Sequence, residues 1–283
     1  MLAIVALAQV AQSIRHSRVV SLTAYTLSQG PILEALEQAC KNGARVRVRL
    51  EGIPHNDTHN GLRNHNCDTV ERLRSLGADA AVNEAQPQLH MKAVIADSVA
   101  FLDDRNWPGN GGDTILRDDD AADVAAIADA MQGRPASKAR LSTSKGNAVA
   151  AEANMLYASH CSHLEVQSES FTFSKEAYGA LKRQALSGTK VRLIVSKRDI
   201  HKRERLALCK LQGYGVEVRV SESNEKLALA GTHAWIGSAN ATAGQPDEID
   251  WGMKVDDRSI VRSLKARFEA NWNCARAFGA PTN

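Results

Sequence analysis

The sequence predicts an α/β protein made of two similar βαβ-type lobes, with mixed, mostly parallel sheets flanked by helices and a pseudo-twofold relation between the lobes. Strand-like stretches alternate with stretches of helical spacing, which is typical of βαβ units. The same order of segments also occurs twice. The texts "NGARVRVRL" (42–50) and "SGTKVRLIV" (187–195) show the repetition most directly.

In the first half, residues 19–25 are apolar and β-branched enough to predict a strand. Residues 32–40 carry apolar side chains at helical spacing, and Gly43 suits the left-handed position that ends a helix. Residues 45–50 alternate arginine with apolar residues, so we expect a strand with one buried face.

The second half repeats this pattern, with strands expected at 164–173 and 190–195 around a helix that ends at Gly188. Further blocks match in the same order, namely 73–82 with 208–218 and 89–106 with 223–240. We therefore expect one lobe in residues 1–135 and a second in 136–283, joined by a stretch of linker composition at 133–138.

The start of the chain is apolar, and Ile4, Leu7, Ala11 and Ile14 follow helical spacing, which favours an amphipathic first helix. No apolar run is long enough for a transmembrane segment. The five cysteines are widely spaced and form no C-x-x-C motif, which favours reduced thiols and a cytoplasmic protein. A net charge of +3 is compatible with an anionic substrate without requiring nucleic acid.

The first candidate catalytic residues are His90 and Lys92, followed by Asp97 and Asn106. We expect a strand from 89 to 96, on which His90 and Lys92 point to the same face. A neutral imidazole can attack a phosphodiester and form a covalent intermediate, while an ammonium group neutralises the phosphate oxygens. The amide of Asn106 would donate hydrogen bonds to those oxygens, and the carboxylate of Asp97 would orient the imidazole or balance the lysine.

H-x-K-x4-D followed by G-S-x-N resembles the signature of the phospholipase D superfamily, which two-lobed members carry twice. In the first copy, Asp103-Asp104 replaces Gly-Ser before Asn106. The resemblance covers nearly the whole chain and implies phosphodiester cleavage without metal or other cofactor. One histidine attacks phosphorus, a second protonates the leaving oxygen, and water then hydrolyses the phosphohistidine.

The second copy is incomplete, because Asn224 stands where the family has histidine and Gly231 where it has aspartate. By resemblance, the two copies would meet in one site with His90 as the nucleophile. The catalytic residues would be His90, Lys92, Asp97, Asn224 and Lys226, and the phosphate ligands Asn106, Ser238 and Asn240.

The missing histidine leaves three interpretations open. The enzyme uses one histidine with another acid, or a homodimer pairs two copies of His90, or the chain is a catalytically dead phosphate binder. Asn224 is either natural or a substituted histidine, and His233 is the nearest replacement for it. Asp113 and Asp250 follow the two motifs at matching places, where an acid supports the motif residues in the family.

No metal site is expected. Histidines gather in two stretches, at 55–65 and at 160–163, but neither has the tight ligand spacing of a metal site. The first stretch has no counterpart in the second half, so we interpret it as an inserted loop able to line a substrate groove.

The sequence therefore predicts a metal-independent phosphodiesterase that acts on nucleic acid or another non-lipid phosphodiester through a phosphohistidine. A nucleic-acid substrate would make activity fall steeply with salt. The alternatives are a phospholipid-hydrolysing or phosphatidyl-transferring enzyme of the same fold, and a phosphate-binding homologue without activity.

Overall fold

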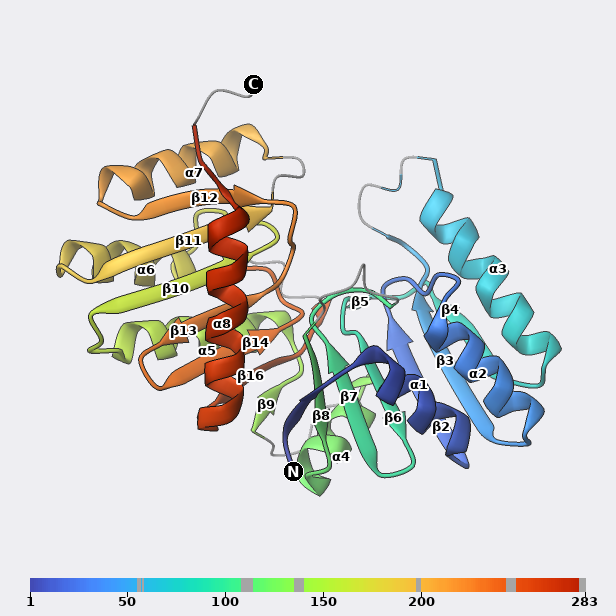
Figure 1. The fold of residues 1–283 in the computed structure, drawn as a ribbon. Helices are drawn as coiled ribbons and strands as arrows, with labels where there is room; N and C mark the ends of the chain where they lie inside the picture. The colour runs from blue at the N-terminus through green and yellow to red at the C-terminus, as the bar shows by residue number, and fades with distance from the viewer. Residues whose placement is uncertain are drawn as a thin grey trace. The chain divides into compact units, whose positions relative to one another are not determined.

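The computed structural model describes residues 1–54, 57, 59–107, 114–134, 140–196, 200–242 and 248–279. These residues form two compact units, each with its own sheet (Figure 1). The first lobe comprises residues 1–144 together with 247–251, and the second comprises 145–246 and 252–283. The sequence placed a single boundary after residue 135, and the return of 247–251 to the first lobe was not predicted.

The first lobe contains β1 (Ala3–Val5), α1 (Leu7–His16), β2 (Val19–Ala24), α2 (Pro31–Lys41), β3 (Arg45–Glu51), α3 (Gly61–Ser75), β4 (Asp79–Asn83), β5 (Gln88–Leu89), β6 (Ala93–Ala96), β7 (Val99–Asp103), β8 (Ile115–Asp118), α4 (Ala121–Ala130), β9 (Leu141–Ser142) and β15 (Glu248–Ile249). Its main sheet has the order β1-β8-β7-β6-β2-β3-β4. Val46, Val48 and Leu50 of β3 pack with apolar residues of α1, α2 and α3 in one core.

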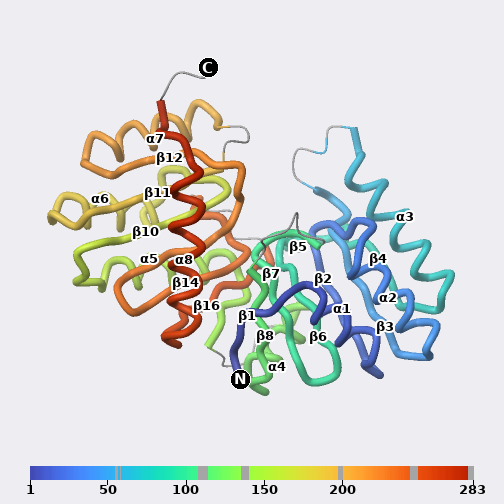
Figure 2. The backbone as a smooth tube through the Cα atoms, in the orientation of Figure 1, coloured from blue at the N-terminus to red at the C-terminus, as the bar shows by residue number. Residues whose placement is uncertain are grey.

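The second lobe contains α5 (Lys145–Ala158), β10 (His163–Ser168), α6 (Ala177–Leu186), β11 (Lys190–Ser196), α7 (Lys202–Gly213), β12 (Glu217–Ser221), β13 (Leu227–Ala230), β14 (His233–Gly237), β16 (Gly252–Val255), α8 (Arg258–Cys274) and β17 (Arg276–Ala277). Its strands follow the order β17-β12-β11-β10-β13-β14-β16. Helix α8 runs across one face of this sheet in Figure 2, and Val191, Leu193 and Val195 pack against helices on the other face.

The duplication predicted from the sequence is visible in the strand order, because β8-β7-β6-β2-β3-β4 corresponds to β16-β14-β13-β10-β11-β12. The glycines predicted to end helices, Gly43 and Gly188, have φ values of +83° and +86°. Both sheets are mixed, as expected, but most of their described strand pairs are antiparallel, so the expectation of mostly parallel sheets was wrong. The parallel pairs in the first sheet are β2–β3 and β3–β4, whereas its other pairs are antiparallel, because β6 and β7 form a tight hairpin at Asp97–Ser98.

Two local expectations were wrong. The chain starts with strand β1 before α1 begins at Leu7, so Ile4 lies on a strand that pairs with β8. The expected strand at 89–96 is interrupted, since only β5 and β6 are strands and His90 to Lys92 lie between them. Among the described helices, none combines the length and apolar character that crossing a bilayer requires.

Candidate active site

The H-x-K segment lies at the edge of the first sheet where the parallel strands β2, β3 and β4 end. Residue Ala93 of β6 pairs with Thr23 near the end of β2, so His90 and Lys92 lie beyond that edge. The strand is interrupted because the backbone amides of His90 and Met91 both donate to the carbonyl of Ile249, on β15. Ligands commonly bind at this carboxyl edge in open α/β sheets.

His90 has a carboxylate partner, Asp250. The Nδ1 atom of His90 lies 2.7 Å from an Oδ1 atom of Asp250, whose side chain is fully buried. Because a carboxylate accepts hydrogen bonds, Nδ1 is the donor and the lone pair of the neutral ring lies on Nε2. This arrangement suits a nucleophile, since the acid fixes the ring and stabilises the cation that forms when Nε2 bonds to phosphorus.

Tyr25, the residue after β2, contacts both motif side chains. Its ring meets the His90 ring edge-on, with centroids 5.6 Å apart, and the Lys92 ammonium lies 5.8 Å from its centroid. Lys92 is almost completely buried. His90 and Lys92 therefore approach the same aromatic ring, as expected if they serve a common site. Sequence reasoning did not single out Tyr25.

Glu51, at the end of β3, holds the segment that leads into His90. Its carboxylate accepts from the backbone amides of Leu89, at 2.6 Å, and Ile53, at 2.7 Å. Burial raises the pKa of Glu51, although these amide hydrogen bonds act in the opposite direction. This residue was also missed, although a glutamate at the carboxyl end of a predicted strand, where ligands commonly bind, was a usable signal.

Asp97 does not orient the imidazole or balance the lysine, which corrects the sequence-based expectation. It is exposed in the β6–β7 turn with φ of +52°, and its Oδ1 accepts from the amides of Arg18 and Val19, at 3.0 Å each. Because β6 separates it from the H-x-K segment, its contribution is to the turn and to the start of β2. The carboxylate that contacts the imidazole of His90 belongs to Asp250 instead.

The residues after β7 lie at the same edge as the motif, since the amide of Asp103 donates to the carbonyl of Lys92 at 2.9 Å. Asp104 is buried and accepts from the amide of Thr114. Within the described residues, the buried Oδ1 atom of Asn106 has no hydrogen-bond partner.

In the second lobe, Lys226 is buried beside a carboxylate that occupies the place of Tyr25. The Lys226 ammonium lies 3.0 Å from Glu169, whose other oxygen is 3.5 Å from the amide nitrogen of Asn224. Glu169 follows β10 as Tyr25 follows β2, because β10 and β2 pair in the same register with β13 and β6. The motif lysine of this lobe thus already binds an internal anion.

Ser238 and Asn240 follow β14 and complete the second motif. Ser238 is fully buried, and within the part of the chain that the structure describes the Oδ1 atom of Asn240 is buried without a partner, as in Asn106. Phe171 bridges to Ala241 just as Leu27 bridges to Trp107. The two asparagines therefore hold equivalent positions, each in its own lobe.

His233 is not a replacement for the missing histidine. It starts β14 at the end that pairs with Ala230, and it is exposed beside Asp256. Lys226, in contrast, precedes the opposite end of β13.

The inserted loop expected around residues 55–65 is partly helical, because His65 lies within α3, where its side chain contacts the carbonyl of Leu27. His55 and Asp113 lie outside the described residues.

One group of side chains could hold a metal ion among the described residues. His90, Glu248 and Asp250 offer ligand atoms within 4.8 Å of one another. The group includes the candidate nucleophile, so an ion bound through its imidazole would compete with the proposed chemistry. The sequence did not predict this juxtaposition, because residues 90 and 248 are far apart in the chain.

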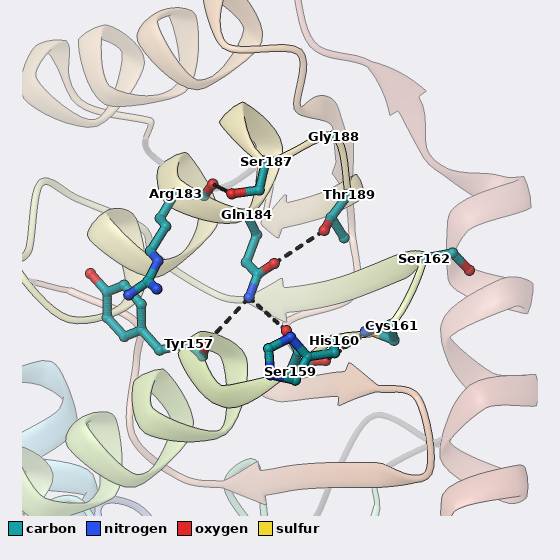
Figure 3. A pocket seen from close by; sticks show the side chains of 10 residues that line it. All are labelled: Tyr157, Ser159, His160, Cys161, Ser162, Arg183, Gln184, Ser187, Gly188 and Thr189. Carbon is teal, nitrogen blue, oxygen red and sulfur yellow. Dashed lines mark hydrogen bonds between the residues drawn. The ribbon is translucent and has the colours of Figure 1, made fainter.

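A cavity of about 480 Å³ lies at the other edge of the second sheet. Figure 3 shows Gln184 at its centre, bonded to Thr189 and to carbonyls at the end of α5, with His160 and Cys161 on the rim. The residues that line the cavity include those directly before β10 and β11. Lys226 lies at the opposite end of these strands, where β10 ends. The cavity contains no motif residue, and Cys161 donates to the carbonyl of His163.

Comparison with known proteins finds one family-model match, which lies mainly in the second lobe. Residues 154–272 match the family model of the cardiolipin synthase, phospholipase D-like domain. No curated protein matches the chain by sequence.

Two solved structures share the whole two-lobed fold. Phosphatidylserine synthase from Haemophilus influenzae is 9% identical, with a TM-score of 0.68 over 98% of this chain and 87% of that chain. Polyphosphate kinase from Porphyromonas gingivalis is 16% identical, with a TM-score of 0.68 over 96% of this chain. This chain spans 50% of that kinase's length.

Proposed function

We propose that the chain is a phosphodiesterase of the phospholipase D superfamily with His90 as nucleophile, because its second lobe matches a phospholipase D-like family model and its fold is that of two-lobed solved structures. The hydrogen bond between His90 and Asp250 supports this proposal most strongly. It directs the Nε2 lone pair away from the buried carboxylate, and the Lys92 ammonium lies beside the same Tyr25 ring that the imidazole contacts.

In the proposed reaction, His90 Nε2 forms a bond to phosphorus while the bond to the leaving oxygen breaks. Lys92 neutralises the non-bridging oxygens, and Asn106 donates hydrogen bonds to them. Water then attacks the phosphohistidine, which restores the neutral imidazole and releases the phosphate product. Asp250 stays ionised and stabilises the histidinium through both steps.

The second lobe contributes phosphate binding in this proposal through Lys226, Ser238 and Asn240. Asn224 carries an amide that neither takes up nor releases a proton near neutral pH, so it is no general acid. Substrates whose leaving group departs without protonation should therefore react fastest.

The test uses bis(p-nitrophenyl) phosphate, whose leaving group needs no acid, in the presence of EDTA. We expect turnover by the unmodified protein and its loss in His90→Ala. The matched control is His233→Ala, which removes an exposed histidine that also has a carboxylate partner. Turnover that survives in His90→Ala would refute the assignment of the nucleophile, and no turnover in any variant would favour a phosphate-binding homologue.

We propose a non-lipid phosphodiester such as nucleic acid as substrate. The second candidate is phosphatidyl transfer or phospholipid hydrolysis, which the description of the matching family model favours. Single-stranded oligonucleotides and phosphatidylglycerol vesicles, assayed side by side with the same His90→Ala control, separate the two. Activity on vesicles alone would overturn the first choice.

A further inference from the structure

The open face of the first sheet differs from the same face of the second sheet. Arg45, Arg47 and Arg49 alternate with the core residues of β3, so they project from the face opposite α1, α2 and α3. Together with Val19, Ser21, Gly77 and Asp79, Arg45 and Arg47 line a groove of about 360 Å³. We call these lining residues together with Arg49 the arginine face.

The second lobe shows the corresponding face covered by a helix. Arg192 holds the position of Arg47, because Arg192 pairs with Glu165 and Glu217 in the register in which Arg47 pairs with Ser21 and Asp79. Helix α8 packs on this face, and Arg192 forms ion pairs with Glu269 of α8 and with Glu165.

Aromatic residues of α8 complete the cover. The Arg192 guanidinium lies 5.2 Å from the ring centroid of Phe268 and 4.9 Å from that of Trp272, and Arg219 lies 4.3 Å from the latter. A guanidinium over an aromatic face is a favourable contact. The side chain of Arg192 is 19% exposed as a result, whereas that of Arg47 is 51% exposed.

The difference arises from helix length. Helix α4 corresponds to α8, since each follows the last strand of its sheet and is capped by an aspartate, Asp120 or Asp257. Helix α8 has 17 residues and α4 has 10, or about 25 Å against about 15 Å. Consequently α4 packs on β6 and β7, whereas α8 also reaches β12. Among the described elements, the helices with extensive contacts to β3 and β4 are α2 and α3, which lie on the opposite face.

We propose that the arginine face binds an amphipathic helix of a partner protein, which presents a glutamate beside aromatic residues as α8 does with Phe268, Glu269 and Trp272. The charge of the face favours this occupant. Three arginines stand against one acid, Asp79, which bridges Arg47 and Arg49 at 2.8 and 2.9 Å. The exposed Val19, at 38%, offers an apolar contact to the same helix.

The experiment uses the full chain and a fluorescent peptide with the sequence of α8, residues 258–274, carrying Cys274→Ser. In this peptide the exposed Arg258, Arg262 and Lys265 are replaced by glutamine, because the natural segment has four cationic side chains and one acid and would be repelled by the arginine face. We expect saturable binding in fluorescence anisotropy and at least about tenfold weaker binding by Arg47→Glu, since opposed like charges across an interface are strongly unfavourable. A peptide with Glu269→Lys should bind Arg47→Glu better than it binds the unmodified protein. Arg203→Glu, an exposed arginine of α7, is the matched control and should bind normally.

Absence of saturable binding, or equal binding by Arg47→Glu with an unchanged melting temperature, would overturn the proposal. Two further results would identify a different occupant of the arginine face. Self-association that Arg47→Glu abolishes in sedimentation would identify a second copy of this chain, and an oligonucleotide bound through Arg47 would identify a phosphate backbone.

Discussion

The imidazole of His90 is hydrogen-bonded to Asp250, a residue 160 positions further along the chain, with 2.7 Å between Nδ1 and Oδ1. This pair fixes which ring nitrogen carries the proton. It also places a buried negative charge where the imidazole would become positive in the proposed attack on phosphorus.

The first prediction concerns this pair. Asp250→Asn keeps the size of the side chain but allows the wrong tautomer and removes the charge, so kcat on bis(p-nitrophenyl) phosphate should fall by about 10²- to 10⁴-fold with little change in KM. Asp256→Asn removes the carboxylate beside the exposed His233 and should leave kcat unchanged. Equal kcat values for both variants would mean that Asp250 does not support the nucleophile.

Asp97 should show the opposite behaviour. Asp97→Ala removes the acceptor of two backbone amides and places alanine at φ of +52°, so the melting temperature should fall by about 2–4 °C or more. Asparagine tolerates this conformation, so the melting temperature of Asp97→Asn should fall less. The kcat of folded protein should stay unchanged in both, as measured at a temperature well below either transition; a loss of kcat would restore a catalytic role for Asp97.

Glu169 should compete with external anions for Lys226. Their ion pair joins a buried ammonium to a carboxylate that is 34% exposed, so its loss removes a negative charge that competes with phosphate beside Lys226. Glu169→Gln should bind inorganic phosphate about 2- to 10-fold more tightly, measured by calorimetric titration. The gain should disappear when Lys226→Met is added. An unchanged affinity would show that the carboxylate does not occupy the anion position.

Glu152, on α5, should make stability depend on pH. It is buried with no hydrogen-bond partner for Oε2 among the described residues, and burial raises its pKa to about 8. A raised pKa in the folded state means that stability is fully present below the unfolded value, near 4.5, and is lost as the pH rises through the folded value.

Glu152→Gln removes this dependence. The variant should melt close to the unmodified protein at pH 4.5 and above it by about 5 °C or more at pH 8.5, as each kcal/mol is worth about 2–4 °C in a protein of this size. Thermal melts across this range test the sign directly. A difference in melting temperature that stays constant with pH would rule out protonation of Glu152 as the cause.

The duplicated fold, and the choice of the H-x-K segment as a candidate site, could be predicted from the sequence. Both depend on local signals, namely periodicity, glycine positions and residue types at short spacing. Sequence reasoning named Asp250 as an acid able to support a motif residue but did not predict that Asp250 pairs with His90, since their proximity depends on how residues 248–251 return to the first lobe. Tyr25 was missed because its contacts with His90 and Lys92 also depend on the fold. Asp97 was assigned to the wrong contact because the four residues of β6 carry it away from Lys92 and into a turn, which sequence spacing alone does not show.

The return of residues 248–251 to the first lobe has a genetic consequence. The halves of this duplicated chain are not interchangeable modules, because a fragment ending at residue 246 would retain His90 but lack its acid. The second half is therefore required by the proposed site, even though Asn224 and Gly231 stand where the family has histidine and aspartate. A substitution at position 250 should act on the same site as one at position 90, although the two positions lie in different repeats.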